Sequence, residues 1–422
     1  MTSSTRQPRG SGSRRRVRPA PTGQSYPAPR PSRQPVPRQS YRPAMAKRTS
    51  EKPRRRARKP HTIDMTTMCA TLLLLIIGLI ALFSASYSSA LYSQGSATYF
   101  IVRQLRWAAV GLAAMYVLSR IDYHGYVMVV NPAIVISVAL LILVLIPGVG
   151  TTTKGATRWL FGFQPSELAK DTIIIAFSAW ASTKYKDMQH LRKLAYPYGL
   201  LLFIYVGLLY KEPHTSAIII CCAIGLIILI AAGIRIWFLV PAIVLAVLGG
   251  FGAYMTLEHV QKRVNIWLDP FSDMRKTGFQ AAMGQIAIGS GGLFGRGLGN
   301  GMQKQLYLPE PHNDFIFATW CEEMGLIGAL IIIAIFAFLI WRGFYIARSS
   351  PDRMGMLLAT GITAKLAIQT LMNLCVVTGI MPVTGAALPF FSYGGTALML
   401  QLAEMGILLN VSRYMRIESR SK

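Results

Sequence analysis

The stretch Thr71-Leu72-Leu73-Leu74-Leu75-Ile76-Ile77-Gly78-Leu79-Ile80-Ala81-Leu82-Phe83 decides the fold of this chain. It belongs to an apolar run that is longer than the ~20 residues a helix needs to cross a bilayer. Similar runs follow it along the chain. The expected spans are approximately 65–92, 101–119, 126–147, 165–183, 196–210, 214–232, 235–255, 314–341, 354–377 and 391–411. The sequence therefore predicts an all-α polytopic membrane protein with about ten transmembrane helices.

The overall composition supports the same class. The 422 residues are 52% hydrophobic and 14% charged, and the mean hydropathy is +0.40, which is too apolar for a soluble domain of this size. The five cysteines lie in or beside apolar stretches and show no metal-ligand or disulfide spacing, so we assign them no chemistry.

The first 64 residues differ from everything that follows. They hold 18 of the 44 Lys and Arg residues against Glu51 and Asp64, together with eleven prolines. Such a segment cannot bury enough apolar surface to fold, so residues 1–64 are predicted to be a disordered basic cytoplasmic tail. Its position beside a span favours attraction to anionic lipids, and no nucleic-acid partner is expected.

Basic residues also set the predicted orientation. Loops that would lie inside carry Lys184, Lys186, Arg192 and Lys193, and later Arg342, Arg348 and Arg353. Positively charged loops stay on the cytoplasmic side, so both termini are placed there. The domains are then the tail, a transmembrane domain over residues 65–413, and a short cytoplasmic tail over 414–422.

Two segments on the outer side are too polar to cross the membrane. They are residues 148–164 and a large loop of ~58 residues between the seventh and eighth spans, 256–313. The larger loop is glycine-rich over residues 289–299. This run is either a flexible linker or a place where the backbone turns sharply or approaches a ligand closely.

Charged residues inside the predicted spans are few, and such residues are expensive to bury in a membrane. They are Glu167, Lys170, Asp171, Glu322, Glu323, Lys365 and Glu404. We expect them to face one interior cavity, although paired charges that only join helices would give the same pattern. Glu167 and Lys170 are three residues apart, which predicts an ion pair on one side of a helix.

Two clusters on the outer face have residues suited to chemistry. Asp314 is expected in the first turn of the eighth span, with Asn313 as N-cap, where the helix dipole favours an ionised carboxylate. An ordinary capping residue is the alternative. Lys154 and Arg158 gather near Trp159 and have the charge that a pyrophosphate needs, although a membrane-interface anchor explains Trp159 equally well.

Four ordered motifs together resemble those of a known family, the SEDS (shape, elongation, division and sporulation) proteins. They are Gly155-Ala156-Thr157-Arg158-Trp159 with Gln164-Pro165-Ser166-Glu167-Leu168-Ala169-Lys170, then Ala287-Ile288-Gly289-Ser290-Gly291-Gly292-Leu293-Phe294-Gly295, then residues Leu308 to Phe317, then Val383 to Gly395 with Gly406 to Arg413. The third and fourth motifs look more like the division and sporulation branch (FtsW, SpoVE) than the elongation branch (RodA). The sequence departs from the family pattern at Asn313, Met283-Gly284 and Ala387.

The resemblance implies a glycosyltransferase that polymerises lipid II, the undecaprenyl-pyrophosphate disaccharide-pentapeptide, into peptidoglycan. The reaction would take place at the outer face of the bacterial cytoplasmic membrane. Asp314 matches the residue regarded as catalytic in the family. The substrate-binding residues expected with it are Lys154, Arg158, Trp159, Glu167, Lys170, Glu310 and His312. The resemblance also implies a class B penicillin-binding protein as the transpeptidase partner, beside other division or sporulation proteins.

The chemistry expected of such a site is simple. A β-1,4 link made from an α-linked pyrophosphate donor requires one inversion, one base and a stabilised leaving group. Pyrophosphate leaves without protonation if cations neutralise it, so one carboxylate beside several cations suffices. No cofactor is assigned, and the metal ligands are unknown; assistance by a divalent cation, Mg²⁺ or Mn²⁺, stays open. A lipid II flippase and a non-catalytic division scaffold are the alternative functions.

Overall fold

The computed structural model describes residues 62–153, 156–184, 188–256, 258–272, 278–305 and 307–415. All of these belong to one compact unit. The predictions for the tail before residue 62 and for residues 416–422 therefore lie outside the described residues, and so does the predicted substrate-binding residue Lys154.

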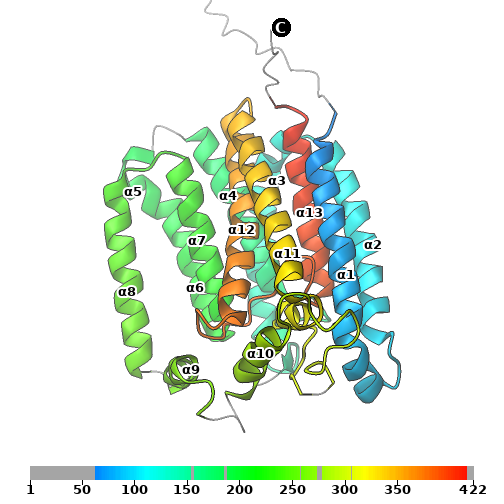
Figure 1. Cartoon of the computed structure of the whole chain (residues 1–422). Helices are drawn as coiled ribbons and strands as arrows, with labels where there is room; N and C mark the ends of the chain where they lie inside the picture. The colour runs from blue at the N-terminus through cyan, green and yellow to red at the C-terminus, as the bar shows by residue number, and fades with distance from the viewer. Residues whose placement is uncertain are drawn as a thin grey trace, which may run out of the picture. The chain divides into compact units, whose positions relative to one another are not determined.

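The described chain is almost entirely helical (Figure 1). The long helices are α1 (Met65–Gln94), α2 (Tyr99–Arg120), α3 (Tyr126–Val144), α4 (Pro165–Thr183), α6 (Leu200–Lys211), α7 (Thr215–Ala231), α8 (Leu239–Thr256), α11 (Ile316–Ser349), α12 (Arg353–Val377) and α13 (Gly395–Ser412). The shorter elements are η1 (Tyr123–Gly125), α5 (Leu191–Leu194), η3 (Ala195–Gly199), η4 (Ile236–Phe238), α9 (Glu258–Leu268) and α10 (Phe279–Ser290). The strands β1 (Thr151–Thr153) and β2 (Ala156–Trp159) pair antiparallel as a hairpin.

The predicted polytopic all-α fold is confirmed. Within the described residues, seven helical segments are long and apolar enough to cross a membrane, and the 17-residue α7 is a shorter apolar helix. The remaining two predicted spans correspond to α4, which carries charged residues near its start, and to α8. Each of the ten apolar runs thus forms a helix because a backbone in lipid must satisfy its hydrogen bonds within the segment.

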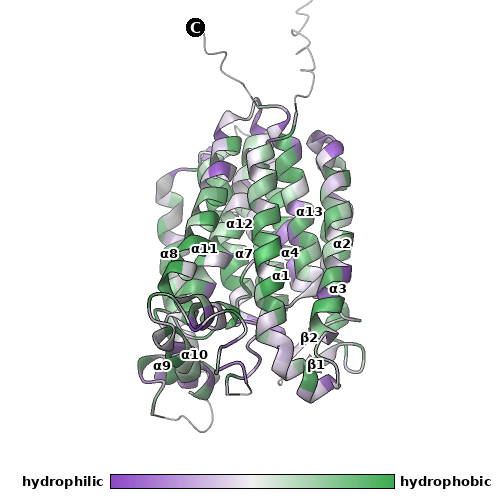
Figure 2. Ribbon diagram, turned by 45° about the vertical axis from the view of Figure 1, so that its right-hand side comes forward, coloured by the Kyte–Doolittle hydropathy of each residue, from purple (hydrophilic) through white to green (hydrophobic). Residues whose placement is uncertain are grey.

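The helices differ in depth within the bundle. In the most apolar windows of α12 and α13, 72% of the residues are buried, against 22% in α2 and α3. α12 and α13 are therefore central, while α2 and α3 expose much of their surface. Figure 2 shows the spans as mostly apolar, with hydrophilic residues gathered toward the two ends.

The two ends of the bundle carry different structures. At one end, which we call the terminal end, the Asp64 carboxylate lies 2.8 Å from Arg342, and the Asp64 backbone N–H donates to Ser412 Oγ. At the opposite end, the loop end, lie α9, α10 and the β1–β2 hairpin (Figures 1 and 2). Both ends of the described chain thus meet at the terminal end, as an even number of spans requires.

The glycine-rich run has a structural explanation. Backbone N–H groups of Arg296 and Gly297 donate to the carbonyls of Glu322 and Glu323 at 3.0 and 2.9 Å, where Gly325 interrupts α11 with φ 66°. A Cβ at Gly295 would collide with the Glu323 carbonyl oxygen. The close approach anticipated for this run is therefore made to the backbone of α11.

Candidate functional site

The centre of the bundle holds a group of buried charges that we call the core charge cluster: Glu167, Lys170 and Asp171 on α4, Lys365 on α12 and Glu404 on α13. The Lys365 ammonium lies 2.6 Å from Asp171 Oδ1 and 3.8 Å from Glu167 Oε2, and it also contacts Glu404 Oε1. Lys170 lies 2.7 Å from Glu167 Oε1, so the predicted pair forms. Three carboxyl groups thus share two ammonium groups and join three helices.

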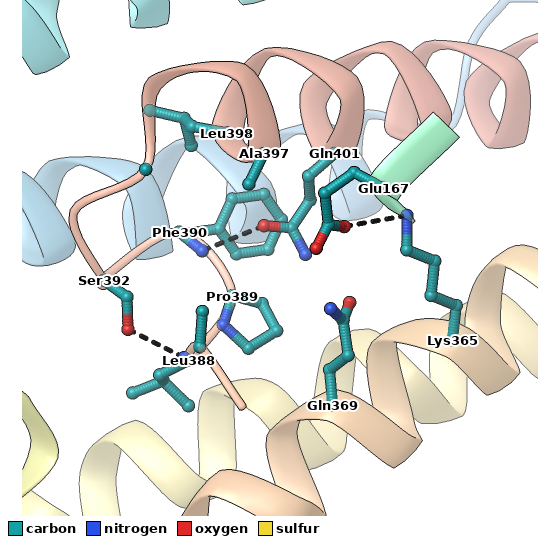
Figure 3. Close-up of a pocket in the computed structure, with 12 residues that line it drawn as sticks. Glu167, Lys365, Gln369, Leu388, Pro389, Phe390, Ser392, Ala397, Leu398 and Gln401 are labelled. Atoms are coloured by element: carbon teal, nitrogen blue, oxygen red, sulfur yellow. Dashed lines mark hydrogen bonds and ion pairs between the residues drawn. The ribbon is translucent and has the colours of Figure 1, made fainter. Parts of the chain in front are cut away.

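A small pocket opens beside this cluster (Figure 3). Glu167, Lys365, Gln369 and Gln401 supply its polar lining, and the segment from Ala387 to Phe390 closes it. Its volume of about 30 Å³ has room for about two water molecules and is far too small for a sugar. The pocket as it stands can therefore hold water but not a sugar ring.

Asp314 lies at the loop end, directly before α11. The Asn373 side chain donates to the Asp314 carbonyl at 2.8 Å and to the Ala386 carbonyl at 2.7 Å, which ties the residue to α12 and to the 383–394 segment. The carboxylate faces the backbone of Gly385, where a Cβ would stand 3.4 Å from Asp314 Oδ2. Asp314 is partly exposed.

The expected capping by Asn313 is wrong. Helix α11 begins at Ile316, its N-cap is Phe315, and no side chain caps it. The Asn313 amide instead donates to Glu310 Oε2 at 2.8 Å. Asp314 therefore lies in the turn before the helix rather than in its first turn, because the local hydrogen bonds of the turn compete with the cap.

The β hairpin brings Arg158 to the same end. Its guanidinium donates to the backbone carbonyls of Glu212, at 3.3 Å, and of Pro213. Burial and the nearby Arg263 lower the pKa of Arg158, while Asp314 and Glu212 favour its charged form. Arg158 is therefore within electrostatic range of both carboxyl groups and of a second arginine.

Three groups near Arg158 are absent from the predicted site: Glu212, His214 and Arg263. Glu212 and His214 are 1% and 6% exposed, and neither carboxyl oxygen of Glu212 nor His214 Nδ1 has a hydrogen-bond partner among the described residues. Burial raises the pKa of Glu212 to about 8, against the opposing effect of Arg158. Burial, with help from Arg158 and Lys170, lowers the pKa of His214 to about 3.

We call Arg158, Glu212, His214, Arg263 and Asp314 the loop-end site. Glu212 escaped the sequence analysis because it falls at the junction of the spans predicted over 196–210 and 214–232, where charges are not unusual. The sequence pattern that could have indicated this site is a Glu and a His within three residues, between two apolar runs. Arg263 lies on α9, which sequence analysis treated only as part of a long loop.

The other predicted substrate-binding residues occupy varied places. The His312 ring is buried against Phe100, with centroids 4.3 Å apart, and lies 5.8 Å from the Tyr393 ring. Glu310 has a positive φ of 49°, and Trp159 is half-buried on the hairpin.

The pocket beside the core charge cluster is lined by Glu167 but not by Asp314, Arg158 or Lys170. His214 links the two regions, since it is influenced by Arg158 as well as by Lys170 and Glu167.

The expectation that all buried charges face one cavity is wrong. Glu322 and Glu323 belong to a second group, the loop latch, which also contains Lys304 and Ser84. Lys304 Nζ lies 2.5 Å from Glu323 Oε1 and 2.8 Å from Ser84 Oγ, and the Met302 N–H donates to Glu322 at 2.8 Å. The loop latch fastens the segment that leads to Asp314 onto α1 and α11.

Among the described residues, no group of three or more His, Cys, Asp or Glu side chains could hold a metal ion. Assistance by Mg²⁺ or Mn²⁺, which the sequence leaves open, has no set of protein ligands among these residues.

Fold and site together define a polytopic membrane protein with ion-paired charges in its core and a second charged site at one end. The FtsW/RodA/SpoVE family, described as cell cycle proteins, matches residues 65–417, and the chain belongs to this family. The resemblance drawn from the motifs is thereby confirmed.

Individual relatives agree with this assignment. Stage V sporulation protein E of Bacillus subtilis is 39% identical over 85% of this chain and 99% of its own length. A probable peptidoglycan glycosyltransferase FtsW of Geobacter is 36% identical over 85% and 99%.

Two solved structures share the fold. A chain of a peptidoglycan synthase complex matches with a TM-score of 0.70 and 27% identity, over 83% of this chain and 98% of that one. The rod shape determining protein RodA of Thermus thermophilus matches with a TM-score of 0.61 and 26% identity, over 84% and 98%.

Proposed function

We propose that this protein is an inverting peptidoglycan glycosyltransferase that polymerises lipid II at the outer face of the bacterial cytoplasmic membrane. Several relatives carry the name probable peptidoglycan glycosyltransferase FtsW, which supports the reaction class. The observation that carries the proposal is the placement of the Asp314 carboxylate within electrostatic range of Arg158 at one end of the bundle.

In this reaction Asp314 is the base. It accepts the proton of the acceptor sugar hydroxyl as that oxygen attacks the anomeric carbon of the donor. Arg158 and Arg263 neutralise the pyrophosphate that leaves on the opposite side, since fixed cations stabilise developing negative charge. Lys170 is paired with Glu167 at 2.7 Å, so we assign it to the positive field of the site rather than to direct contact with the pyrophosphate.

The orientation follows from the charge at the terminal end. Arg342, Arg348, Arg353 and Arg413 lie in helix ends and turns there and favour the cytoplasm. The loop-end site then faces outward, where the polymer is needed. Both termini are cytoplasmic in this arrangement.

The lipid chain of the substrate needs access from the side. Helix α8 lies at the left-hand edge of the helices in Figure 1. Its exposed side chains, among them Val247, Leu248 and Phe251, are apolar. An apolar surface of this kind suits contact with the undecaprenyl chain of the substrate.

The related peptidoglycan synthase complex supports a partner for this chain, which we propose to be a class B penicillin-binding protein. The deciding experiment combines the purified protein with that partner and lipid II in detergent and measures glycan strands. Glycan synthesis is expected. A protein that makes no glycan in this assay, but moves lipid II across the membrane of reconstituted vesicles, would be a flippase. Adding EDTA or Mg²⁺ to the same assay tests for a divalent cation.

A further inference from the structure

Glu212 is the least explained charged side chain in the described part of the molecule. It lies between α6 and α7, is 1% exposed, and both of its carboxyl oxygens lack a hydrogen-bond partner among the described residues. Buried polar groups in folded proteins nearly always have a partner, and the cost of leaving one unpaired is substantial. Two oxygens without a protein partner leave their hydrogen-bonding capacity to water or to a ligand.

The surroundings indicate what kind of ligand this is. Arg158 donates to the backbone carbonyl of Glu212, and the buried carboxyl group of Glu212 has no hydrogen-bond partner among the described residues. Two arginines, Arg158 and Arg263, act on this region, and His214 Nδ1 is a second buried atom without a partner in the described chain. Arginines suit the phosphate groups of a ligand, and unpaired polar groups suit the hydroxyl groups of a sugar, so this region suits a sugar joined to a phosphate.

The protonation of Glu212 is opposite to that expected of Asp314. Burial raises the pKa of Glu212 to about 8, so at neutral pH it is a carboxylic acid with a proton to donate. The charged and titratable groups around this corner are Arg158 on β2, Arg263 on α9, Lys170 and Glu167 on α4, His214 before α7 and Asp314 before α11. A carboxylic acid at Glu212 and the base proposed at Asp314 can divide the roles of acid and base.

We propose that Glu212 is a second catalytic residue, which donates its proton to the pyrophosphate as the bond between that group and the donor sugar breaks. The role rests on the proposed function. The reaction requires at minimum one base and the cations that stabilise the leaving group. An acid at Glu212 accelerates departure of the pyrophosphate, but the reaction can proceed slowly without it.

The step balances in atoms and charge. The acceptor oxygen forms a bond to the anomeric carbon and loses its proton to Asp314. The bond from that carbon to the pyrophosphate oxygen breaks, its electron pair stays on the pyrophosphate, and the Glu212 proton passes to the pyrophosphate. Glu212 is left as a carboxylate beside Arg158, and water exchanges protons with both residues before the next turnover.

The test uses the full chain with its penicillin-binding partner and lipid II, and measures the rate of glycan synthesis between pH 6 and pH 9.5. Glu212→Gln keeps the shape and a hydrogen-bond donor but has no proton to give, so the rate at pH 7 is expected to fall about a hundredfold. In the wild type, activity falls as pH rises through about 8, the pKa of Glu212, because the acid form is lost above it. Glu212→Gln should lose that alkaline decline.

The matched control is Glu258→Gln, which removes an exposed carboxylate on α9 and is expected to leave both rate and pH profile unchanged. Thermal unfolding in detergent verifies that Glu212→Gln folds. If this variant is folded and polymerises at the wild-type rate, or is slow but keeps the alkaline decline, Glu212 is not the acid. A wild-type protein that makes no glycan contradicts the proposed function itself, which separates the two failures.

Discussion

The core charge cluster and the loop-end site both bury titratable side chains, but they pair them differently. In the core, each carboxyl group lies against an ammonium group, with Lys365 contacting Asp171 and Glu404, and Lys170 contacting Glu167. At the loop end, Glu212 and His214 have polar atoms without a partner in the described chain. The difference separates paired side chains that join helices from unpaired side chains, which we propose interact with the substrate.

The largest effect is expected from Asp314→Asn, which keeps the shape of the side chain and removes the base. Glycan synthesis should fall by about 10³-fold or more, while fold and partner binding persist. Asp314→Glu should retain little, since ~1 Å of displacement at a reacting centre costs about a hundredfold. The measurement is polymerisation of lipid II by the purified complex.

Glu310→Gln is the control for that experiment, because Glu310 is the other carboxylate four residues upstream. An Asp314→Asn protein with near wild-type activity, together with an inactive Glu310→Gln protein, would reassign the base to Glu310.

Next in size is the loss of Lys365 from the core. Lys365→Met leaves Asp171, Glu404 and Glu167 with only Lys170 among them, and removing one partner of a buried ion pair typically costs about 3–5 kcal/mol. We expect a large drop in the thermal unfolding temperature in detergent. Lys365→Met combined with Glu404→Gln should recover part of it; equal stability of wild type and Lys365→Met would show that the core charges do not hold the helices together.

A smaller effect is expected at Arg158. Arg158→Gln removes one of two arginines near the leaving group and the bonds to the carbonyls of Glu212 and Pro213. The rate should fall about tenfold to a hundredfold, less than for Asp314, because Arg263 still supplies positive charge. The double variant Arg158→Gln, Arg263→Gln tests this sharing, and strictly additive losses would argue against a common site.

The smallest effect is expected outside both regions. Deletion of residues 1–55 removes a cationic segment without the composition to form a core, so insertion and polymerisation in vitro should stay nearly intact. Its expected role is recruitment to anionic membrane. Loss of polymerase activity in the truncated protein at equal folded yield would place the tail in the enzyme itself.

Part of the candidate site could be predicted from the sequence motifs, and part could not. Asp314, Arg158 and the Glu167–Lys170 pair stand in strings typical of the family, and the last two are close in sequence, so their contact follows from helix geometry. Glu212 and Arg263 lie in no such string. They join the site only because the turn between α6 and α7, the hairpin and α9 meet at one end of the bundle.

The sequence by itself determined that the chain spans a membrane, which runs become helices and which residues are costly to bury, because lipid allows only apolar segments with satisfied backbones to cross. The tertiary structure decided how the costly residues are grouped. It divided them between the core charge cluster and the loop latch, moved Asp314 out of the helix into a turn, and left Glu212 without a partner in the described chain. Contacts in these clusters join segments that are far apart in the chain. Ser84 and Glu323, for example, are 239 residues apart, and no local pattern of residues can encode a contact over that separation.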